Sequence, residues 1–377
     1  MVLTSEDFIV KAKEFAEEYV KPISKELDES NRFPEELLHS MVKRKFLGIH
    51  YPIEYEGGGE SSLTSFNVVK ELSKASPGVG LMFIVHWMAV DVLLKYGTDE
   101  QKEKYLKDLI KGKRVAAYSI SEAVAGSDAA GINTIAEKTE EGWKLNGTKY
   151  FCTNGSIADV YLVACKTEPE QGAKGISIFI VEKDSEGLSI TDYADKMGFR
   201  SSPTTNLVLK DCIIPDENLI GLENKGFKIA MDGLTGGRLG MVAIGIGIAE
   251  AAMERAIKHA NNRKAFGKPL SKLYSIQEKI ASSHISLEAA KGLFEKTCFK
   301  RDYGDNYSIE SSVAKVFTAK AVRNICYEAM QILGGHGYYK DNDVERYYRD
   351  GRLIDIGVGA TEVLNMVIGS TILRRYK

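Results

Sequence analysis

The chain has 377 residues, 44% of them hydrophobic, with 50 Lys and Arg against 52 Asp and Glu and a net charge of −2. This length predicts two or three packed units rather than one core. The near-neutral charge gives no electrostatic basis for binding nucleic acid or an anionic membrane surface. A basic flank followed by an apolar stretch is missing from the first residues, so we expect a cytoplasmic protein.

The most apolar stretch is Leu81–Leu94, which contains His86 and Asp91. We expect it to be too short to span a bilayer, and we expect no membrane partner. The five cysteines are scattered without the spacing of metal ligands. This pattern predicts no metal site, a reducing compartment and buried thiols.

Residues 1–115 are expected to form a helical N-terminal domain. Ser5–Glu29 has apolar residues at helical spacing, and Thr98–Gln101 has the pattern of a capped helix start. Gly57–Gly59 marks a turn between helices.

Residues 116–225 have the pattern of strands. Trp143–Thr148 contains an Asn-Gly pair, which predicts a hairpin turn. Val160–Cys165 and Ile176–Val181 are short β-rich runs bounded by turn residues.

Residues 226–377 return to long helices, predicted at Leu239–Asn261, Ile276–Asp302 and Ser308–Leu333. Helices, then strands, then helices predict the α+β class.

Several motifs occur in the same order as in the acyl-CoA dehydrogenase family, which this chain resembles from about residue 33 to residue 373. The resemblance implies an N-terminal α-helical domain, a central β-barrel domain and a C-terminal four-helix bundle. It also implies an acyl-CoA substrate. The motifs are Tyr118–Asp128, Phe151–Gly155, Gly236–Arg238, Arg263–Leu270, Gly334–Tyr338, Val344–Arg352 and Ile356–Val363.

The resemblance implies FAD as the cofactor. An isoalloxazine ring needs an aromatic or apolar wall and a few fixed donors, and Phe151 is the expected wall. In the family, an element like that at Arg263 reaches across a subunit boundary to the adenosine half of FAD, so we expect a homotetramer rather than a monomer. The residues expected to bind FAD are Ser121, Gly126, Ser127, Phe151, Thr153, Arg263, Phe266, Gln331, Gly334 and Gly335.

The C-terminal motif departs from the family at the residue that does the chemistry. In the family, a Glu in Ile-Tyr-Glu-Gly-Thr removes the α-proton while hydride leaves the β-carbon for the flavin. Aligned on Gly359, this chain has Val358 at the Glu and Gly357 at the Tyr. Some relatives instead carry the Glu just before the residue matching Arg238, which here is Gly237. Arg238, Gly357 and Val358 are expected to line the thioester site, where the main-chain N–H of Val358 would still stabilise an enolate.

Asp91 is the remaining candidate base. At helical spacing it shares a face with Trp87 and Met88, and the matching helix of the family lines the acyl pocket. Among such neighbours the pKa of its carboxyl is expected to rise, which suits a base. The alternative is a surface ion pair between Asp91 and Lys95, one turn further on.

Other polar residues are weaker candidates. Glu122 belongs to the flavin-loop pattern and is expected to be structural, and His86 is expected to be a satisfied core histidine. Glu362 lies one turn beyond Val358, and Asp355 is expected in a connecting turn.

A base remote from the thioester suits a substrate that is already unsaturated. A γ-proton of an α,β-unsaturated thioester is acidic because its carbanion delocalises onto the thioester oxygen. Gly357 leaves space for a ring beside the α-carbon. We therefore expect cyclohex-1-ene-1-carbonyl-CoA to lose a proton from C3 to Asp91 and hydride from C6 to the flavin, a 1,4-elimination.

This combination resembles the cyclohexenecarbonyl-CoA dehydrogenases of anaerobic alicyclic and aromatic metabolism, one branch of the family. Family members mostly pass electrons to an electron-transferring flavoprotein, which is the expected partner. Three alternatives stay open: a saturated short- or branched-chain acyl-CoA dehydrogenase with a relocated base, a flavin monooxygenase on the same fold, and a CoA- or flavin-binding subunit without activity.

Overall fold

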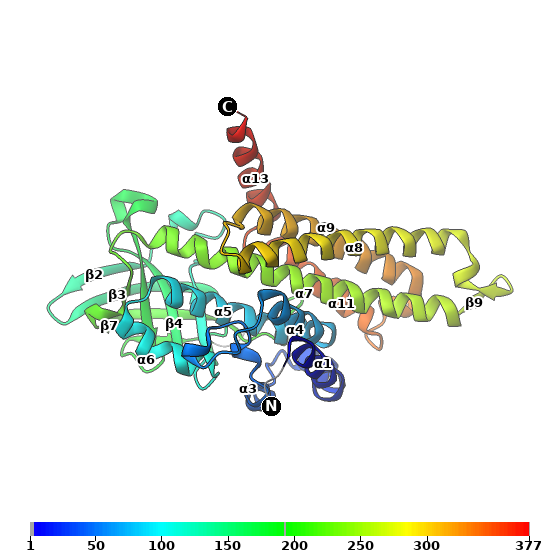
Figure 1. The fold of residues 1–377 in the computed structure, drawn as a ribbon, viewed down its shortest axis with the longest axis horizontal. Coiled ribbons are helices and arrows are strands. Elements are labelled where there is room, and N and C mark those ends of the chain that lie inside the picture. Colours follow the sequence, from blue (N-terminus) through cyan, green and yellow to red (C-terminus); the bar gives the residue numbers. More distant parts are fainter. Residues whose placement is uncertain (1–3, 192–193, 377) are drawn as a thin grey trace.

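A computed structural model describes residues 4–191 and 194–376 as a helical N-terminal part, a central β-sheet and a helical C-terminal part (Figure 1). The sheet lies at one end of an elongated molecule, and the long C-terminal helices extend to the other end. The predicted α+β class, with strands between two sets of helices, is confirmed.

The first helix is broken, although Ser5–Glu29 was expected to be continuous. A π-helical turn at Ala16–Val20 and a 3-10 turn at Lys21–Ile23 interrupt it. Pro22 lies in the 3-10 turn, where it has no N–H to donate to a continuous helix. The N-terminal α-helices are α1 (Ser5–Phe15), α2 (Ser24–Ser30), α3 (Glu35–Lys43), α4 (Ser62–Ala75), α5 (Pro77–Tyr96) and α6 (Asp99–Ile110).

The predicted capped start of α6 is confirmed. The Thr98 hydroxyl accepts the N–H of Gln101, and the Gln101 side chain accepts the N–H of Thr98. This reciprocal pair satisfies two N–H groups that a helix start leaves without partners.

The apolar stretch in α5 is longer than the sequence suggested. By length and composition, the 20-residue α5 and the 37-residue α7 (Gly226–Asn262) are long and apolar enough to cross a membrane. Within their most apolar windows, 89% and 94% of the residues are buried inside the protein. Packing in the core therefore accounts for their composition.

The central strands form one sheet in the order β6-β7-β3-β2-β4-β5-β8, and β1 pairs with β4 in parallel. Chain segments far apart in sequence thus lie side by side, because β3 pairs with β7. The strands are β1 (Ala116–Ser119), β2 (Ile135–Thr139), β3 (Gly142–Thr153), β4 (Val160–Lys166), β5 (Ile176–Glu182), β6 (Leu188–Ile190), β7 (Thr204–Ile214) and β8 (Leu219–Ile220).

The hairpin predicted at Trp143–Thr148 is wrong, because β3 runs straight through that segment. The turn lies earlier, between Thr139 and Gly142. Gly147 has φ +152°, and a Cβ added there would lie 2.4 Å from the Thr134 hydroxyl oxygen. It marks a close backbone approach at a register shift rather than a turn.

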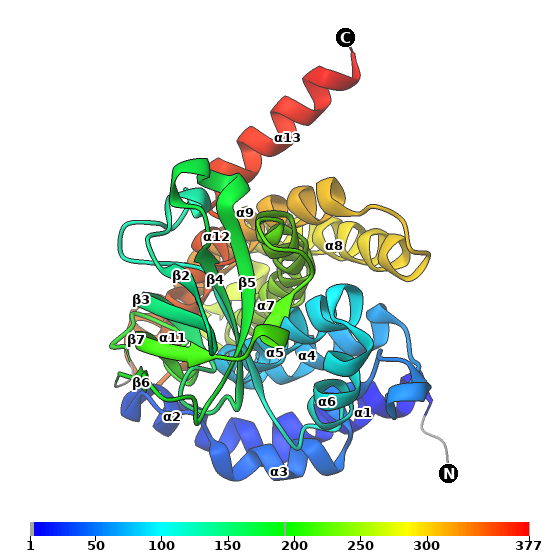
Figure 2. The same cartoon turned by 90° about the vertical axis from the view of Figure 1, so that its left-hand side faces the viewer.

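The C-terminal part is built on three long helices, α7, α8 (Tyr274–Asp302) and α9 (Ser308–Leu333). α7 begins well before the predicted start at Leu239, since several glycines in its first turns hid the helix from propensity. The C-terminal helix α13 (Thr361–Arg375) projects away from the body (Figure 2). The remaining elements are β9 (Lys264–Ala265), β10 (Lys268–Pro269), α10 (Gly335–Tyr338), α11 (Asp343–Gly351), α12 (Leu353–Ile356) and α13 (Thr361–Arg375).

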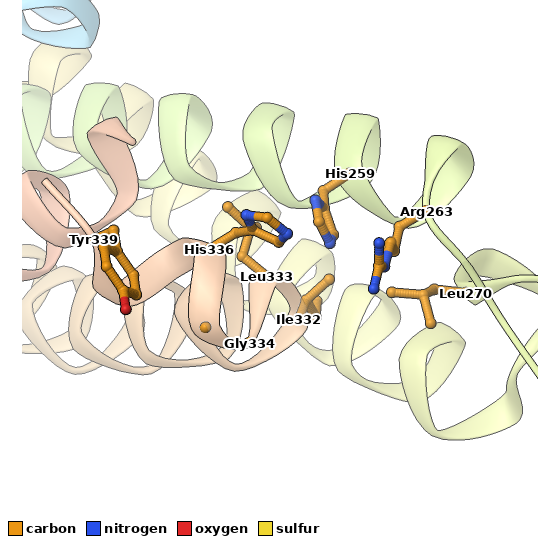
Figure 3. A pocket seen from close by; sticks show the side chains of 9 residues that line it. His259, Arg263, Leu270, Ile332, Leu333, Gly334, His336 and Tyr339 are labelled. Carbon is orange, nitrogen blue, oxygen red and sulfur yellow. The ribbon is translucent and has the colours of Figure 1, made fainter. Parts of the chain in front are cut away.

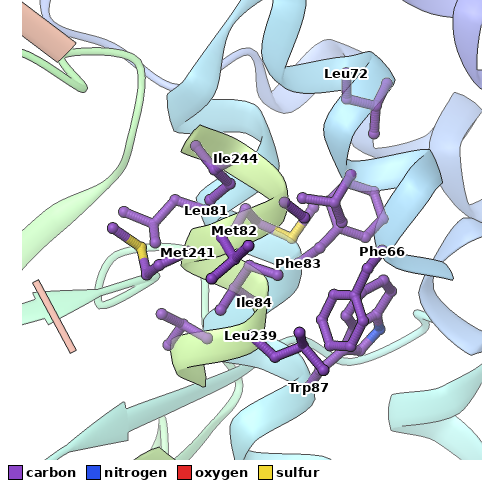
Figure 4. Close-up of a cluster of buried hydrophobic side chains, with 14 of the residues drawn as sticks. Phe66, Leu72, Leu81, Met82, Phe83, Ile84, Trp87, Leu239, Met241 and Ile244 are labelled. Atoms are coloured by element: carbon purple, nitrogen blue, oxygen red, sulfur yellow. The ribbon is translucent and has the colours of Figure 1, made fainter. Parts of the chain in front are cut away.

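A shared core fixes α5 against α4 and α7 (Figure 4). Phe66 from α4, Phe83 and Trp87 from α5, and Leu239 and Ile244 from α7 are each at most 2% exposed. Burying one such side chain contributes roughly 1.5–3 kcal/mol. This packing holds the faces of α5 and α7 that carry the candidate active site.

Candidate active site

Two consecutive glycines of α7 let α5 and the C-terminal loop approach the helix closely. A Cβ added to Gly236 would lie 3.1 Å from Asp91 Oδ2. A Cβ added to Gly237 would lie 2.6 Å from Met88 Sδ and 2.9 Å from Val358 Cγ1. The two positions where the family carries its glutamate, 237 and 358, therefore meet, and the Asp91 carboxylate lies beside them.

Asp91 belongs to a buried polar cluster. Arg301 Nη2 donates to both carboxylate oxygens, at 3.1 Å to Oδ1 and 2.9 Å to Oδ2. The Tyr51 hydroxyl donates to Oδ1 at 3.1 Å, and His50 Nε2 lies 3.9 Å from the same oxygen. The side chain of Asp91 is 25% exposed. The alternative pair with Lys95 does not form, because Lys95 binds Asp232 instead.

The expected rise in the pKa of Asp91 is wrong. Burial raises the pKa of this carboxyl, but the charge of Arg301 and the contacts with His50 and Tyr51 outweigh burial, so the pKa lies below its ordinary value. The carboxylate is therefore ionised at neutral pH and able to accept a proton. It is a weaker base than an unpaired buried carboxylate would be.

Arg301→Met is expected to move the acid limb of activity toward neutral pH. Without the guanidinium, burial dominates and the pKa of Asp91 rises. Activity that needs the carboxylate is present above this pKa and is lost as pH falls through it. The lowered pKa of Asp91 also stabilises the native fold at pH values above the pKa of the carboxyl in the unfolded chain. This stability is lost as the pH falls through the pKa of Asp91 in the folded protein.

The measurement is the pH dependence of substrate-driven flavin bleaching, with Arg255→Met as control. Arg255 also pairs with an aspartate, Asp343, but away from Asp91. Identical acid limbs in the Arg301→Met variant and the unaltered protein would show that Asp91 does not limit the reaction.

The loop that carries Val358 has a strained backbone, and hydrogen bonds from Lys315 hold it in place. Val358 has φ +54°, a conformation that β-branched residues rarely adopt. The fully buried Lys315 donates to the carbonyls of Gly359, at 2.6 Å, and of Asp355, at 3.3 Å. Burial lowers the pKa of Lys315 to about 8, although Asp355 opposes that shift. Lys315 thus fixes both ends of the turn that orients Val358.

Arg238 also faces this loop. It is 8% exposed, and its Nε is a buried donor without a hydrogen-bond partner among the described residues. A Cβ added to Gly359 would lie 3.8 Å from that nitrogen. A Cβ added to Gly357 would make only ordinary contacts, the nearest at 3.4 Å to Met241. A Cβ at 357 is therefore tolerated without a clash.

The FAD residues predicted in the sheet lie together. Ser121 follows β1 and Phe151 lies in β3, and the N–H of Tyr150 donates to the Ser121 carbonyl at 2.8 Å. Phe151 is 68% exposed, and its backbone φ is +58°. A Cβ added to Gly126 would meet nothing within 4 Å. An exposed ring, open backbone and nearby hydroxyls, including Thr153 at the end of β3, fit a large planar cofactor.

A second group of predicted FAD residues surrounds a cavity of about 490 Å³ (Figure 3). Arg263, Gly334 and Gly335 line it together with His259 and His336. Nearby, Phe266 is 91% exposed at the tip between β9 and β10. Gln331 lies in the last turn of α9 and is exposed.

The two groups lie at opposite ends of the elongated molecule, the first on the sheet and the second beside β9 (Figure 1). One copy of the chain does not bring Phe151 and Arg263 to the same ligand. Both groups bind a single FAD only if a second copy contributes one of them.

The residues judged weaker have structural roles. Glu122 accepts from the N–H groups of Asn133 and Thr134 and from Lys149. His86 Nδ1 accepts the N–H of Ala116, so its Nε2 donates to the carbonyl of Leu109.

The two remaining acidic candidates and the five thiols also have defined positions in the fold. Asp355 is a buried residue of α12 rather than part of a turn, and Glu362 is exposed in the first turn of α13. All five cysteines are buried and free, as predicted.

Sequence reasoning missed the residues around Asp91. Arg301 lies 210 residues further on, and His50 lies in an irregular segment between short helical turns. Tyr307, whose hydroxyl would lie 3.8 Å from a Cβ at Gly236, precedes α9. No local pattern marks any of them.

Comparison with known proteins places this geometry in a family. The models of the N-terminal, middle and C-terminal domains of acyl-CoA dehydrogenases match residues 4–113, 117–212 and 224–373. A short-chain specific acyl-CoA dehydrogenase of Clostridium acetobutylicum is 39% identical over 99% of both chains. A 3-(aryl)acrylate reductase of Clostridium sporogenes is 40% identical over 96% of this chain and 97% of its own.

Solved structures agree with these matches. The butyryl-CoA dehydrogenase of Megasphaera elsdenii superposes with a TM-score of 0.96 at 36% identity, covering 99% of both chains. Together the fold and the matches define an FAD-dependent oxidoreductase that acts on acyl-CoA substrates. The chain belongs to the acyl-CoA dehydrogenase family.

Proposed function

We propose that the protein converts cyclohex-1-ene-1-carbonyl-CoA to cyclohexa-1,5-diene-1-carbonyl-CoA by 1,4-elimination. One observation carries the proposal. The two positions that hold the base in relatives, Gly237 and Val358, lack a carboxylate, while Asp91 places one at the adjacent Gly236. The carboxylate therefore comes from α5 and meets α7 one residue before Gly237, rather than from α7 or the C-terminal loop.

The displaced carboxylate fits the chemistry of an unsaturated thioester. Asp91 takes the C3 proton, and the resulting charge delocalises through the double bond to the thioester oxygen. The N–H of Val358, on its strained turn, is the donor for that oxygen. When bound, FAD supplies the acceptor for the hydride from C6. Glycine at 357 puts no side chain beside the α-carbon, where relatives often have Tyr, and this suits a ring.

The relatives support a second candidate, oxidation of a saturated short-chain acyl-CoA. The Clostridium acetobutylicum relative is named as short-chain specific, and an acryloyl-CoA reductase of Anaerotignum propionicum is 39% identical over 99% of this chain. In this candidate Asp91 would remove an α-proton. The absence of a carboxylate at Gly237 and Val358 favours the cyclic, vinylogous substrate.

The test is to mix the oxidised holoprotein anaerobically with each thioester and follow the flavin absorbance. Cyclohex-1-ene-1-carbonyl-CoA is expected to bleach the flavin, and butyryl-CoA is expected to leave it unchanged. Bleaching by butyryl-CoA would support the short-chain candidate instead. No bleaching by any thioester would overturn both and leave a flavin monooxygenase or a CoA- or flavin-binding subunit without activity.

The arrangement of the FAD residues supports an assembly of several copies, and we propose a homotetramer in the cytoplasm. Phe151 of one copy and Arg263 of another would then hold one FAD. A solved structure of an electron-transferring flavoprotein of Acidaminococcus fermentans contains a chain that superposes with a TM-score of 0.96 at 37% identity. We therefore propose an electron-transferring flavoprotein as the electron acceptor.

A further inference from the structure

We infer that Lys315 is a positioning residue of the reaction, because its ammonium group holds the turn from which the main-chain N–H of Val358 reaches the thioester oxygen. This role rests on the proposed function only in its need for a thioester whose oxygen gathers negative charge. Both candidate substrates, the cyclic and the saturated one, meet that need. Lys315 lies on α9 and acts through the turn rather than on the substrate itself.

The N–H of Val358 is free to bind a ligand. Around it, the N–H of Gly357 donates to the carbonyl of Leu353 at 2.8 Å, and the N–H of Leu364 donates to that of Ala360 at 3.1 Å. The N–H of Val358 itself has no acceptor in the part of the chain that the structure describes. A main-chain donor without a protein partner is satisfied by water or by a ligand. A thioester oxygen at this point completes the pairing.

The turn does not keep its shape by local preference. Val358 has φ +54°, a region that β-branched residues rarely enter. Strained conformations of this kind persist only where the surrounding structure over-determines them. The neighbours Gly357 and Gly359 restrict the backbone less than any other residue would. A group outside the turn must therefore fix the direction of the Val358 N–H.

Lys315 supplies that constraint from α9. Its Nζ donates to the carbonyl of Gly359 at 2.6 Å and to that of Asp355 at 3.3 Å, one on each side of Val358. The Thr361 hydroxyl also donates to the Asp355 carbonyl, at 3.3 Å. Two carbonyls that converge on one ammonium group fix the distance between the two ends of the turn. The N–H between them then keeps one direction.

Lysine is an unfavourable choice for a contact that only supports packing. The side chain of Lys315 is fully buried and forms no ion pair with any residue that the structure describes. The Asp355 carboxylate binds Arg323 and Arg352 instead. A buried ammonium group without a carboxylate partner is unfavourable, so its presence behind the turn points to a functional demand.

The charges that face Lys315 come from three other helices. Burial lowers the pKa of Lys315 to about 8 and Arg238 on α7 adds to this shift, while Asp355 on α12 and Glu362 on α13 oppose it. The ammonium form therefore prevails at pH 7. A measurement at this pH tests the charged lysine and is not disturbed by its titration.

The variant Lys315→Met separates positioning from packing. Methionine fills much of the volume of the buried lysine stem but donates to neither carbonyl. Lys196→Met is the matched control, because Lys196 also donates to two main-chain carbonyls, those of Ala194 and Ser202, which lie outside the turn. A lysine with a merely structural role would change the melting temperature and leave the binding of an enolate unaltered.

The experiment uses the oxidised holoprotein and 2-oxocyclohexane-1-carbonyl-CoA, a β-keto thioester that forms an enolate without any oxidation. Difference absorbance at pH 7 gives the ratio of enolate to neutral thioester in the bound probe. In Lys315→Met this ratio is expected to fall by about 10- to 100-fold, somewhat less than the loss of a whole oxyanion donor. In Lys196→Met the ratio is expected to be unchanged. FAD content and the melting transition are measured for both variants.

A second substitution tests the argument from strain. Asparagine enters positive φ more readily than valine does, so the turn needs less support in Val358→Asn. The loss caused by Lys315→Met is therefore expected to be smaller in the Val358→Asn background, and a double-mutant cycle measures the difference. An equal loss in both backgrounds would show that Lys315 acts through its charge alone and would overturn the positioning role.

An enolate ratio in Lys315→Met equal to that of the unaltered protein would also overturn the inference. So would an unaltered protein that does not raise the ratio above that of the free thioester in water, because Val358 would then not bind the oxygen. If Lys315→Met does not retain its FAD, the milder Lys315→Gln is measured and the same outcomes decide. The proposed function fails separately, if cyclohex-1-ene-1-carbonyl-CoA leaves the flavin unbleached while the probe still binds as its enolate.

Discussion

Asp91→Asn is expected to lower turnover of cyclohex-1-ene-1-carbonyl-CoA by about 10²- to 10⁴-fold, the usual contribution of a general base. The amide has nearly the shape of the carboxylate, and an amide oxygen at the Oδ1 position still accepts from Tyr51 and Arg301. It has no lone pair basic enough to take the C3 proton. FAD content and the melting transition are measured first, so that a loss of fold is separated from a loss of chemistry.

Asp232→Asn is the matched control. Asp232 lies on α7 near Gly236 and also forms ion pairs, with Lys95 and Lys228, but it does not belong to the Asp91 cluster. Turnover in this control is expected to be unchanged. Full turnover in Asp91→Asn would show that another group takes the proton, and this result would remove the basis of the proposed function.

Val358→Glu is expected to create activity that the unaltered protein lacks. The side chain at 358 reaches Gly237, the point where both family base positions meet. A carboxylate there lies where relatives place theirs, so a saturated ring thioester, cyclohexanecarbonyl-CoA, should now lose its α-proton and bleach the flavin. The substitution also removes a β-branched residue from φ +54°, which relieves local strain.

Val358→Gln is the control, since it has the size of Glu but no base. It should stay inert with the saturated ring. An inert Val358→Glu variant that retains its FAD and its melting transition would contradict the pocket geometry inferred from Gly237 and Val358.

The sequence located Asp91 but predicted its electrostatics with the wrong sign. Helical spacing placed it on α5, and its carboxylate faces Gly236, next to one of the two positions that lack the family base. The direction of its pKa depended on Arg301, from a helix 210 residues further along the chain. Local spacing carries no information on such a pair, and only the packing of α5, α7 and α8 brings it together.

Local sequence patterns were also limited in how well they predicted the helices and strands. β4, β5 and α9 match their predicted segments because their apolar patterns are strong and their ends carry turn residues. The Asn-Gly pair at Gly147 predicted a turn, yet glycine is there because the backbone approaches Thr134. The distance between the Phe151 group and the Arg263 group depends on the length of α7. That length could not be predicted from the sequence, because the glycines in the first turns of α7 have low helix propensity.

The most direct measurement of the relocated base is an isotope effect on anaerobic flavin bleaching by cyclohex-1-ene-1-carbonyl-CoA deuterated at C3. With Asp91 removing that proton, bleaching by the C3-deuterated thioester is expected to be slower than bleaching by the unlabelled one, with a primary isotope effect. Equal rates for the two thioesters, together with rapid bleaching by butyryl-CoA, would contradict the account.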